Sequence, residues 1–250
     1  MSGTAREEVA NRLFAMDELA APPCAAIATG RSRRAVDGFD RGAFWESVST
    51  GQHLRMLSHG PAIRAVMRAI LDAEPLAHEF LYLRAAPPGR ATGIHYDYPF
   101  FGQASEKVVT AWVPVGDVPT TDGPLVIVEG SNRFADLIAG MRDLDIARKP
   151  EKKAAYDSSA VELARSRGTR LLTADFRAGD MVLFGMFTAH GSFDNHSAEG
   201  RVRLSFDIRY QPADEPIDAR YFGPHPGGTT GAGYAELNGA RPLTEDWHVR

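Results

Sequence analysis

The stretch from residue 201 to residue 210 alternates polar and apolar side chains at every position, and this pattern restricts the folds open to the chain. The two sets are Arg201, Arg203, Ser205, Asp207 and Arg209, and Val202, Leu204, Phe206, Ile208 and Tyr210. Successive side chains of a β-strand point to opposite faces, so the pattern predicts a strand with one polar and one apolar face. The polar face can line a cavity, whereas the apolar face needs cover from another layer.

Short apolar segments separated by glycine and proline precede this strand, and they predict a mainly β core. The expected strands are 80–84, 94–98, 108–115, 125–128, 181–187 and 202–210. Helical spacing of apolar residues predicts two helices upstream, one over 7–20 and one after Pro61 around 63–70. These amphipathic helices are the candidates to cover the apolar face of the last strand.

Length and composition favour a single domain, because 250 residues with 44% hydrophobic content can bury one sizeable core. We expect one domain over 1–250, with a helical flank over about 1–79, a β core over 80–212 and a C-terminal tail over 213–250. A charged insert near 134–169 interrupts the core. Both a lid over the mouth of a barrel and a peripheral pair of helices fit its sequence. The tail is rich in proline and glycine, and we assign it no chemistry.

Charge and cysteine content restrict the partners and the compartment. A formal net charge of -4 without a dense basic run argues against a nucleic-acid partner. The single cysteine, Cys24, cannot form an internal disulfide, and charged residues break any signal-peptide core within the first 21 positions. No apolar stretch is long enough to cross a membrane, and we therefore expect a cytoplasmic protein. Nothing in the sequence specifies an oligomeric state.

His95 and Asp97 are separated by one residue in a predicted strand, so their side chains are expected on the same face. His190 ends a distant apolar run at a Gly-Ser turn and is the candidate for a third ligand. Two neutral imidazoles and one carboxylate can hold one face of a metal and leave the opposite positions free. This arrangement is typical of non-haem Fe(II) sites that bind a bidentate acid and then O2.

Arg201 lies eleven positions after His190 and begins the polar face of the last strand. Its planar guanidinium matches a carboxylate in a bidentate geometry, and Ser192 can add a hydroxyl to the same group. Such a pair can anchor an acidic co-substrate such as 2-oxoglutarate by its far end. Arg203 shares the strand face with Arg201 and is the second candidate for this role.

In three segments the chain resembles the phytanoyl-CoA dioxygenase-like family of Fe(II)/2-oxoglutarate-dependent oxygenases. The resemblance covers roughly residues 80 to 212. The segments are Pro87-Pro88-Gly89 with His95-Tyr96-Asp97, then residues 111–118 with Asp122-Gly123-Pro124-Leu125 and Glu129-Gly130-Ser131-Asn132-Arg133, and His190-Gly191-Ser192 with Arg201.

The resemblance implies a double-stranded β-helix, a jelly-roll or cupin-like core, with flanking α-helices. It also implies an iron site and a pocket for 2-oxoglutarate. The residues that it assigns to iron are His95, Asp97 and His190, and those that it assigns to 2-oxoglutarate are Arg201, Ser192 and Trp112.

The activity that this resemblance implies is oxidation of an unactivated C–H bond of a small molecule, with O2 as co-substrate and release of succinate and CO2. Hydroxylation is the default outcome, and desaturation, cyclisation or epimerisation are alternatives on the same site. Asp97 disfavours halogenation, because halogenating relatives carry a small residue in place of the carboxylate. Two other hypotheses are a non-catalytic β-barrel binding module that keeps the oxygenase shape, and a zinc hydrolase that uses the same three ligands.

Overall fold

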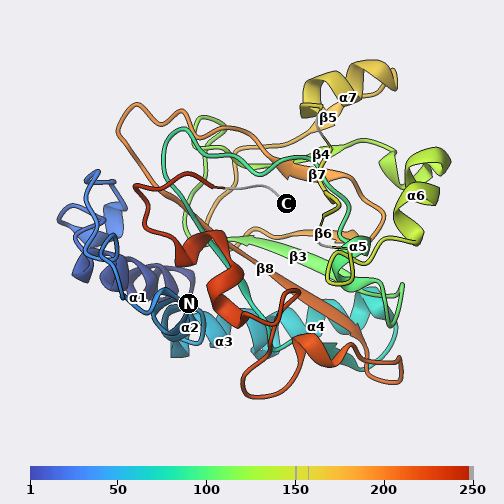
Figure 1. The fold of residues 1–250 in the computed structure, drawn as a ribbon, viewed down its shortest axis with the longest axis horizontal. Coiled ribbons are helices and arrows are strands. Elements are labelled where there is room, and N and C mark those ends of the chain that lie inside the picture. Colours follow the sequence, from blue (N-terminus) through green and yellow to red (C-terminus); the bar gives the residue numbers. More distant parts are fainter. Residues whose placement is uncertain (150, 157, 248–250) are drawn as a thin grey trace.

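Two antiparallel sheets form the core of the protein (Figure 1). We analysed a computed structural model, which describes residues 1–149, 151–156 and 158–247. The larger sheet has the order β1-β8-β3-β6, with β2 also paired to β8, and the smaller sheet has the order β5-β4-β7. The strands of the larger sheet are β1 (Pro75–Ala77), β2 (Tyr82–Ala86), β3 (Val109–Pro114), β6 (Val182–Gly185) and β8 (Arg203–Pro212), and those of the smaller sheet are β4 (Leu125–Val128), β5 (Leu171–Leu172) and β7 (His190–Ser192).

Strand β8 is the centre of the larger sheet, as its alternating sequence predicts. β3 pairs along one edge of β8, with Trp112 opposite Asp207, while β1 and β2 share the other edge. A small apolar cluster, Trp112, Leu125 and Phe184, draws on β3, β4 and β6 and packs between the two sheets. The fold is therefore the double-stranded β-helix expected from the sequence.

The apolar face of β8 is covered by helices from the N-terminal part of the chain, which confirms the prediction for that face. The main cluster joins Leu204, Phe206 and Ile208 to residues of these helices, including Leu13 and Trp45. Figure 1 shows the four helices below the larger sheet. They are α1 (Ser2–Ala15), α2 (Arg41–Ser49), α3 (Gln52–His59) and α4 (Pro61–Leu71).

The number and limits of these helices differ from the prediction of two helices. Helix α4 begins at Pro61 as predicted, but α2 and α3 were not predicted. Helix α1 ends five residues before the predicted limit, because Asp17 adopts a left-handed conformation with φ 61°. The next residue, Glu18, is buried and pairs with the equally buried Arg34 at 2.7 Å.

Two predicted strands are wrong in ways that affect the site. Residues 94–98 do not form a strand: His95 makes isolated bridges, Asp97 has helical dihedral angles, and α5 (Tyr98–Phe101) begins directly afterwards. Pro99 in the first turn favours this early helix. The predicted strand 181–187 ends at Gly185, so His190 starts a new strand, β7, in the other sheet.

The insert, residues 134–169, packs beside the smaller sheet. It contains α6 (Ala135–Arg142) and α7 (Ala160–Ser166), while its positions 150 and 157 lie outside the described residues. Backbone hydrogen bonds join Ile146 to Pro99 and Tyr156 to Ile94, so the insert touches the segment that carries His95. No helix in the described ranges is long and apolar enough to cross a membrane.

The C-terminal segment, residues 213–247, returns across the larger sheet and packs on β2 and α2 (red in Figure 1). Buried Arg34 donates to the carbonyl oxygens of Gly239 and Ala240. A Cβ at position 239 would lie 2.0 Å from the Trp45 ring, so glycine allows this close packing. Short 3-10 turns shape the loops: η1 (Pro23–Ala25), η2 (Ser131–Arg133), η3 (Ala219–Tyr221), η4 (Gly233–Glu236) and η5 (Asn238–Ala240).

Candidate metal centre

Three predicted ligands, His95, Asp97 and His190, meet in the interior of the protein. One ligand atom of each lies within 4.8 Å of the other two, and all three residues are buried. The Nε2 atoms of His95 and His190 lie 3.6 Å and 3.9 Å from Oδ1 of Asp97. The sequence prediction that these residues come together is therefore matched by the geometry.

Backbone pairing between His95, in a loop, and His190, in β7, brings the two histidines together. His95 and His190 exchange two backbone hydrogen bonds, of 2.9 and 3.0 Å, and their ring centroids lie 4.3 Å apart. Gly191 makes this approach possible, because a Cβ at that position would lie 2.6 Å from the carbonyl oxygen of Thr92. The glycine after His190 thus has a packing role in addition to ending the apolar run.

Each imidazole is oriented by its own backbone. Nδ1 of His95 donates to the Gly93 carbonyl at 2.8 Å, and Nδ1 of His190 donates to the Thr188 carbonyl at 2.9 Å. Both Nε2 lone pairs therefore face the cluster. Burial, together with neighbouring His95, lowers the pKa of His190 to about 4, so this ring is neutral near pH 7. A neutral imidazole with its second nitrogen hydrogen-bonded is the usual form of a metal ligand.

Asp97 offers one oxygen to the cluster and uses the other for support. Its Oδ2 accepts hydrogen bonds from Thr110 Oγ1 at 2.6 Å and from Arg209 Nη2 at 3.0 Å, which leaves Oδ1 facing the histidines. Burial alone would raise the pKa of Asp97, but Arg209 and the two histidines hold it well below its usual range. The three residues therefore provide two neutral nitrogens and one fixed anionic oxygen, which is a donor set that fits a divalent metal.

A narrow cavity adjoins the cluster on the side of β8. The residues that line it are Arg84, Thr92, His95, Trp112, Leu125, His190, Gly191, Ser192, Arg203 and Asp207. This lining includes Trp112 and Ser192, which were predicted to contact 2-oxoglutarate, and Arg203, the second candidate for that role. The polar face of β8 lines a cavity, as its alternating pattern predicts.

Arg203 is a buried cation that forms no ion pair with any residue that the structure describes. Arg203 is only 3% exposed. Its Nη1 donates a hydrogen bond to Ser205 Oγ at 2.7 Å, and its Nη2 donates to Ser192 Oγ at 3.5 Å. Its Nε has no hydrogen-bond partner, and within the described part of the chain it forms no ion pair. Burial, with help from nearby Arg84, lowers the pKa of Arg203 to about 10, so the side chain is still charged near pH 7. A buried charge needs a counter-ion, and the cavity is the place for one.

Arg201 lies elsewhere. It precedes β8, and its Nε and Nη2 donate to the carboxylate of Asp122 at 2.7 and 3.1 Å, while Nη1 pairs with Glu199. Asp122 raises the pKa of Arg201 further, and about 30% of the side chain is exposed. Arg201 borders a surface hollow near Arg6 and does not join Arg203 in the cavity. Since its charge is already satisfied by two carboxylates, the geometry favours Arg203 for the role first assigned to Arg201.

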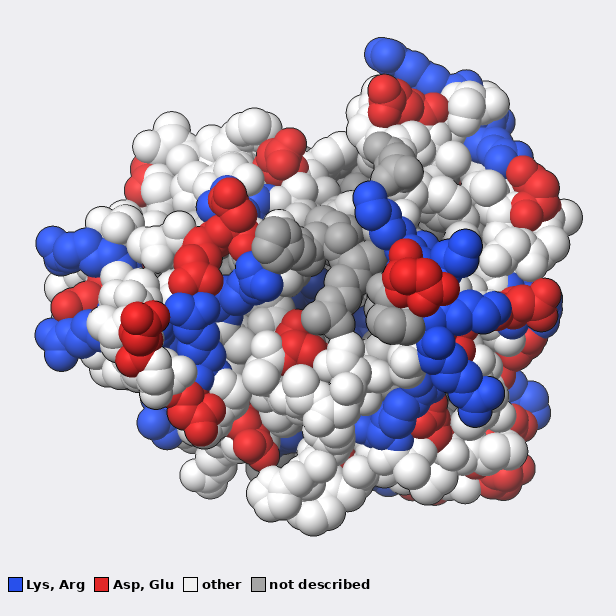
Figure 2. Space-filling view, viewed as in Figure 1, with Lys and Arg blue, Asp and Glu red and all other residues white. Residues whose placement is uncertain are grey.

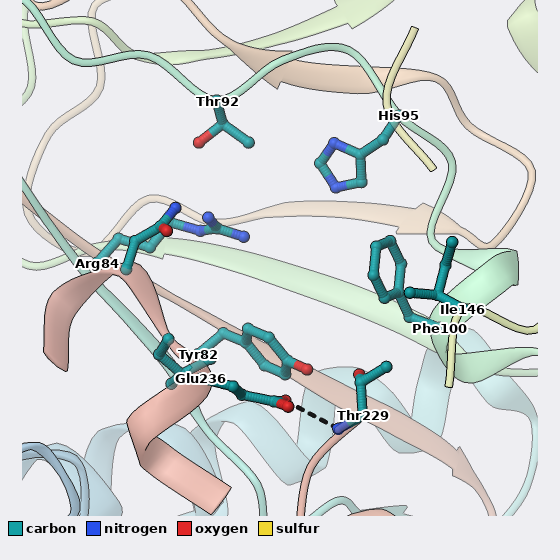
Figure 3. Close-up of a pocket in the computed structure, with 10 residues that line it drawn as sticks. Tyr82, Arg84, Thr92, His95, Phe100, Ile146, Thr229 and Glu236 are labelled. Carbon is teal, nitrogen blue, oxygen red and sulfur yellow. Dashed lines mark hydrogen bonds between the residues drawn. The ribbon is translucent and has the colours of Figure 1, made fainter. Parts of the chain in front are cut away.

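A second, larger cavity of about 130 Å³ adjoins the narrow one and shares Arg84, Thr92 and His95 with it (Figure 3). Its walls come from β2, the insert and the C-terminal segment, which the sequence did not connect to the site. The residues are Tyr82, Arg84, Thr92, His95, Phe100, Ile146, Thr229, Glu236, Leu237 and Asn238. The alternation of Tyr82 and Arg84 on one face of β2 is a signal that could have found those two residues. The Pro- and Gly-rich tail gives no comparable signal.

The fold and the site define a class: a double-stranded β-helix with a buried His-Asp-His cluster beside a cationic cavity is the arrangement of non-haem Fe(II)/2-oxoglutarate-dependent oxygenases. Residues 10–203 match the family described as Phytanoyl-CoA dioxygenase (PhyH). The chain belongs to this family. The cofactors that the resemblance implies, Fe(II), 2-oxoglutarate and O2, agree with this family and with the donor set of the His-Asp-His cluster.

Comparison with individual proteins agrees with this family. The chain is 27% identical over 159 residues to an ectoine dioxygenase of Bordetella bronchiseptica. The aligned region covers 60% of this chain and 51% of that protein. The chain thus spans about half the length of the curated relative that it matches. Among solved structures, AviO1 from Streptomyces viridochromogenes has a TM-score of 0.51 at 18% identity, with 86% of each chain covered. EctD from S. alaskensis has a TM-score of 0.50 at 18% identity, covering 87% of this chain and 72% of EctD. These likenesses show a shared fold.

Proposed function

We propose that this protein is an Fe(II)/2-oxoglutarate-dependent dioxygenase that hydroxylates an unactivated C–H bond of a small molecule. The reaction converts substrate, 2-oxoglutarate and O2 into the hydroxylated product, succinate and CO2. One observation carries the proposal: the buried His-Asp-His cluster and the unpaired buried guanidinium of Arg203 border the same narrow cavity. A metal site alone does not need an unpaired cation beside it, whereas a site for an acidic co-substrate does.

His95, Asp97 and His190 are the residues that hold the metal in this proposal. Bound Fe(II), with 2-oxoglutarate and O2, supplies the oxidation that replaces a C–H bond of the substrate by C–OH. The chain itself fixes the donors: backbone carbonyls hold the two rings, and Thr110 and Arg209 hold the carboxylate. These supports fix the three donors in an orientation in which they can hold a metal.

Arg203 is assigned the far carboxylate of 2-oxoglutarate, in place of Arg201. Ser192 supports this role, because its Oγ accepts from the backbone N–H of Thr92 at 2.8 Å and its hydroxyl hydrogen is free to donate. Trp112 lies on β3 and forms an apolar wall of the cavity. Its indole limits water near the ion pair, which strengthens the attraction between guanidinium and carboxylate.

The larger cavity beside His95 is assigned to the substrate. Its size suits a small molecule, and the relative named ectoine dioxygenase also carries a small-molecule name. Ile146 gives the insert a place in the wall, and the C-terminal segment closes the opposite side. Both segments are therefore part of a single functional unit with the β core, in line with one domain over 1–250.

The test is product analysis with labelled O2, Fe(II) and 2-oxoglutarate in a screen of small metabolites. Hydroxylation predicts one labelled oxygen atom in the product for each succinate formed. Loss of two hydrogens identifies desaturation or ring closure, and an unchanged mass identifies epimerisation, so either outcome contradicts hydroxylation while keeping the oxygenase. If the wild-type protein forms no succinate under any condition and an Asp97→Asn variant is indistinguishable from it, the oxygenase proposal itself fails.

A further inference from the structure

Arg84 is a second arginine of the site with unused hydrogen-bond donors. It projects from β2, and its Nε donates to Asp207 Oδ2 at 2.6 Å. Its two terminal nitrogens, Nη1 and Nη2, make no hydrogen bond to any residue that the structure describes, although only 17% of the side chain is exposed. Arg84 lines both the narrow cavity with Arg203 and the larger cavity beside His95. A half-satisfied guanidinium at this junction is available to a ligand.

Two hydroxyl groups border the same space. Thr92 Oγ1 is a buried atom with no hydrogen bond to the described residues, and Tyr82 Oη faces the side chain of Thr229. Figure 3 shows Arg84 extending into the cavity with Thr92 on one side and Tyr82 on the other. Unpaired buried hydroxyls are costly unless a ligand satisfies them. Together, the guanidinium and the two hydroxyls present donors suited to the oxygens of an anion.

The charges around the cavity disfavour a doubly charged substrate. Arg84 and the buried Arg203 and Arg209 face the buried carboxylates of Asp97 and Asp207, and Glu236 adds a third carboxylate on the wall of the larger cavity. Fe(II) and doubly charged 2-oxoglutarate cancel each other, so their binding does not change this balance. A singly charged substrate adds the least negative charge at the free donors of Arg84, whereas a dianion would add an excess of negative charge beside Asp207 and Glu236.

Glu236 also lies on the wall of the larger cavity, but its carboxylate is already engaged. Oε1 accepts from the backbone N–H of Thr229 at 2.8 Å, and Oε2 accepts from the backbone N–H of Thr230 at 2.7 Å (dashed line for Thr229 in Figure 3). The Thr230 hydroxyl bonds to the same oxygen. These contacts hold the turn of the C-terminal segment. Within the described residues Glu236 does not bond to Arg84, so the terminal nitrogens of Arg84 stay available to a ligand.

Part of the remaining wall is apolar. Phe100, Ile146 and Leu237 form this part, Thr229 and Asn238 add polar groups, and His95 borders the cavity as well. A molecule that places an anionic group on Arg84 therefore has its apolar part against Phe100 and Ile146. Its carbon skeleton then passes beside His95. This arrangement fixes which C–H bond approaches the metal site.

We propose that the substrate is a small carboxylic acid with an apolar body, whose carboxylate binds the terminal nitrogens of Arg84 with help from Thr92 and Tyr82. The inference rests on the proposed function and specifies the substrate class of that site. A carboxylate fits because a planar guanidinium fork matches its two oxygens and because it carries one charge. A phosphate monoester, with nearly two charges, fits the charge balance less well.

The test is anaerobic calorimetry of the protein loaded with Fe(II) and 2-oxoglutarate, against a set of matched compounds. The set contains small carboxylic acids with alkyl or aryl bodies, their primary amides, the corresponding alcohols and amines, and phosphate monoesters. We expect the binders to be carboxylic acids, with each amide at least about 30-fold weaker, because a site built to bind a charged group rejects the analogue that lacks it. If amides, amines or phosphate monoesters bind as well as the acids, or if no acid binds, the inference is overturned.

Three variants connect this preference to the residues. In Arg84→Met the difference between acid and amide should fall to about 3-fold or less, and Thr92→Val and Tyr82→Phe should each reduce it by about 3- to 10-fold. Arg90→Met is the matched control, because Arg90 pairs with exposed Asp246 and does not line the cavity. Should Arg84→Met fail to fold, the two hydroxyl variants decide: an unchanged preference in both contradicts the proposal.

The same samples separate this inference from the proposed function. A visible absorption band that depends on both Fe(II) and 2-oxoglutarate in the wild-type protein supports the oxygenase site, whatever the substrate. A band without a preference for acids defeats the carboxylate inference alone. No band in folded, metal-bound protein defeats the proposed function instead.

Discussion

Arg209 donates a hydrogen bond from Nη2 to Oδ2 of Asp97 at 3.0 Å, and both side chains are only 1% exposed. The guanidinium also lies over the rings of Tyr82 and Phe101, at 4.6 and 4.2 Å from their centroids. This buried ion pair fixes which oxygen of Asp97 faces the two histidines. The metal site therefore depends on a residue of β8 that is not a ligand.

Thr110 supports the same carboxylate oxygen and offers a milder test of this dependence. In Thr110→Val the 2.6 Å hydrogen bond to Asp97 is lost while the side-chain volume is kept. We expect metal affinity to fall by about 10- to 100-fold, as is typical when a support of a metal ligand is removed. Competition with a chelating dye measures it. Thr50→Val is the control, because that exposed hydroxyl bonds only within its own helix. Equal affinity in both variants would show that Thr110 does not position the ligand.

Variants of Arg203 and Arg201 test which of these two arginines binds 2-oxoglutarate. Arg203→Met removes an unpaired buried cation, so we expect the 2-oxoglutarate requirement to rise by about 100-fold with little change in iron affinity. Arg201→Met breaks surface pairs with Asp122 and Glu199 and should leave that requirement within about 3-fold of wild type. Titration of each variant with 2-oxoglutarate makes the comparison. A large rise in Arg201→Met with none in Arg203→Met would restore the assignment first made from the sequence.

Two histidines away from the His-Asp-His cluster, the buried His78 and the half-buried His59, should make the fold sensitive to acid. Burial lowers the pKa of His59 to about 4 and that of His78 to about 3, so both rings are neutral in the folded protein. In the unfolded chain the same histidines bind protons with an ordinary pKa near 6.5. The free energy of unfolding therefore decreases as the pH falls from about 6.5 towards the pKa values of the folded protein.

For a single histidine this loss amounts to about 2 kcal/mol between about pH 7.5 and pH 5. His78 stacks on Tyr221 at 5.4 Å between centroids, so His78→Phe keeps an aromatic ring in place. We expect urea unfolding of this variant to show a pH dependence smaller than that of wild type by about 2 kcal/mol over this range. An identical pH dependence in the two proteins would mean that His78 is already protonated or exposed in the folded state.

The buried pair of Arg34 and Glu18 should stabilise the C-terminal wall of the larger cavity. Arg34 is fully buried and also donates to the carbonyls of Gly239 and Ala240, next to the cavity residue Asn238. Arg34→Met leaves Glu18 unpaired in the interior, and we expect a loss of about 3 to 5 kcal/mol in unfolding free energy. Amide hydrogen exchange should rise first in residues 233–243.

Arg33→Met is the matched control at the adjacent position. Arg33 pairs with Asp17, and both side chains are largely exposed, at 67% and 45%. Such surface pairs contribute little, so the change should stay within about 1 kcal/mol. Comparable destabilisation in the two variants would show that burial of the Arg34 pair has no special role in anchoring the segment.

The sequence predicted those parts of the fold in which the spacing of polar and apolar residues matches the environment that the folded protein gives them. The alternation along β8 identified both faces of the central strand, because one face is buried under helices and the other borders the cavity. The two histidines and Asp97 were correctly brought together, although Asp97 lies at the start of α5 and not in a strand. The sequence could single out these three residues because few residue types can hold a metal, and their role as ligands stays a prediction.

The failures have a common physical cause, which is that long-range contacts override local spacing. Arg201 and Arg203 are equivalent by strand alternation, and only the ion pair with Asp122, 79 positions upstream of Arg201, separates their environments. The role of the C-terminal segment depends on Arg34, more than 200 residues away in sequence from Gly239 and Ala240. Neither contact leaves a pattern in the local sequence.

The measurement that tests the central claim most directly is the visible absorption of the protein titrated anaerobically with Fe(II) and then with 2-oxoglutarate. We predict a charge-transfer band that appears only when both are present, requires His95, Asp97 and His190, and shifts to higher 2-oxoglutarate concentration in Arg203→Met. Folded, metal-bound wild-type protein that shows no such band at saturating 2-oxoglutarate would contradict the account.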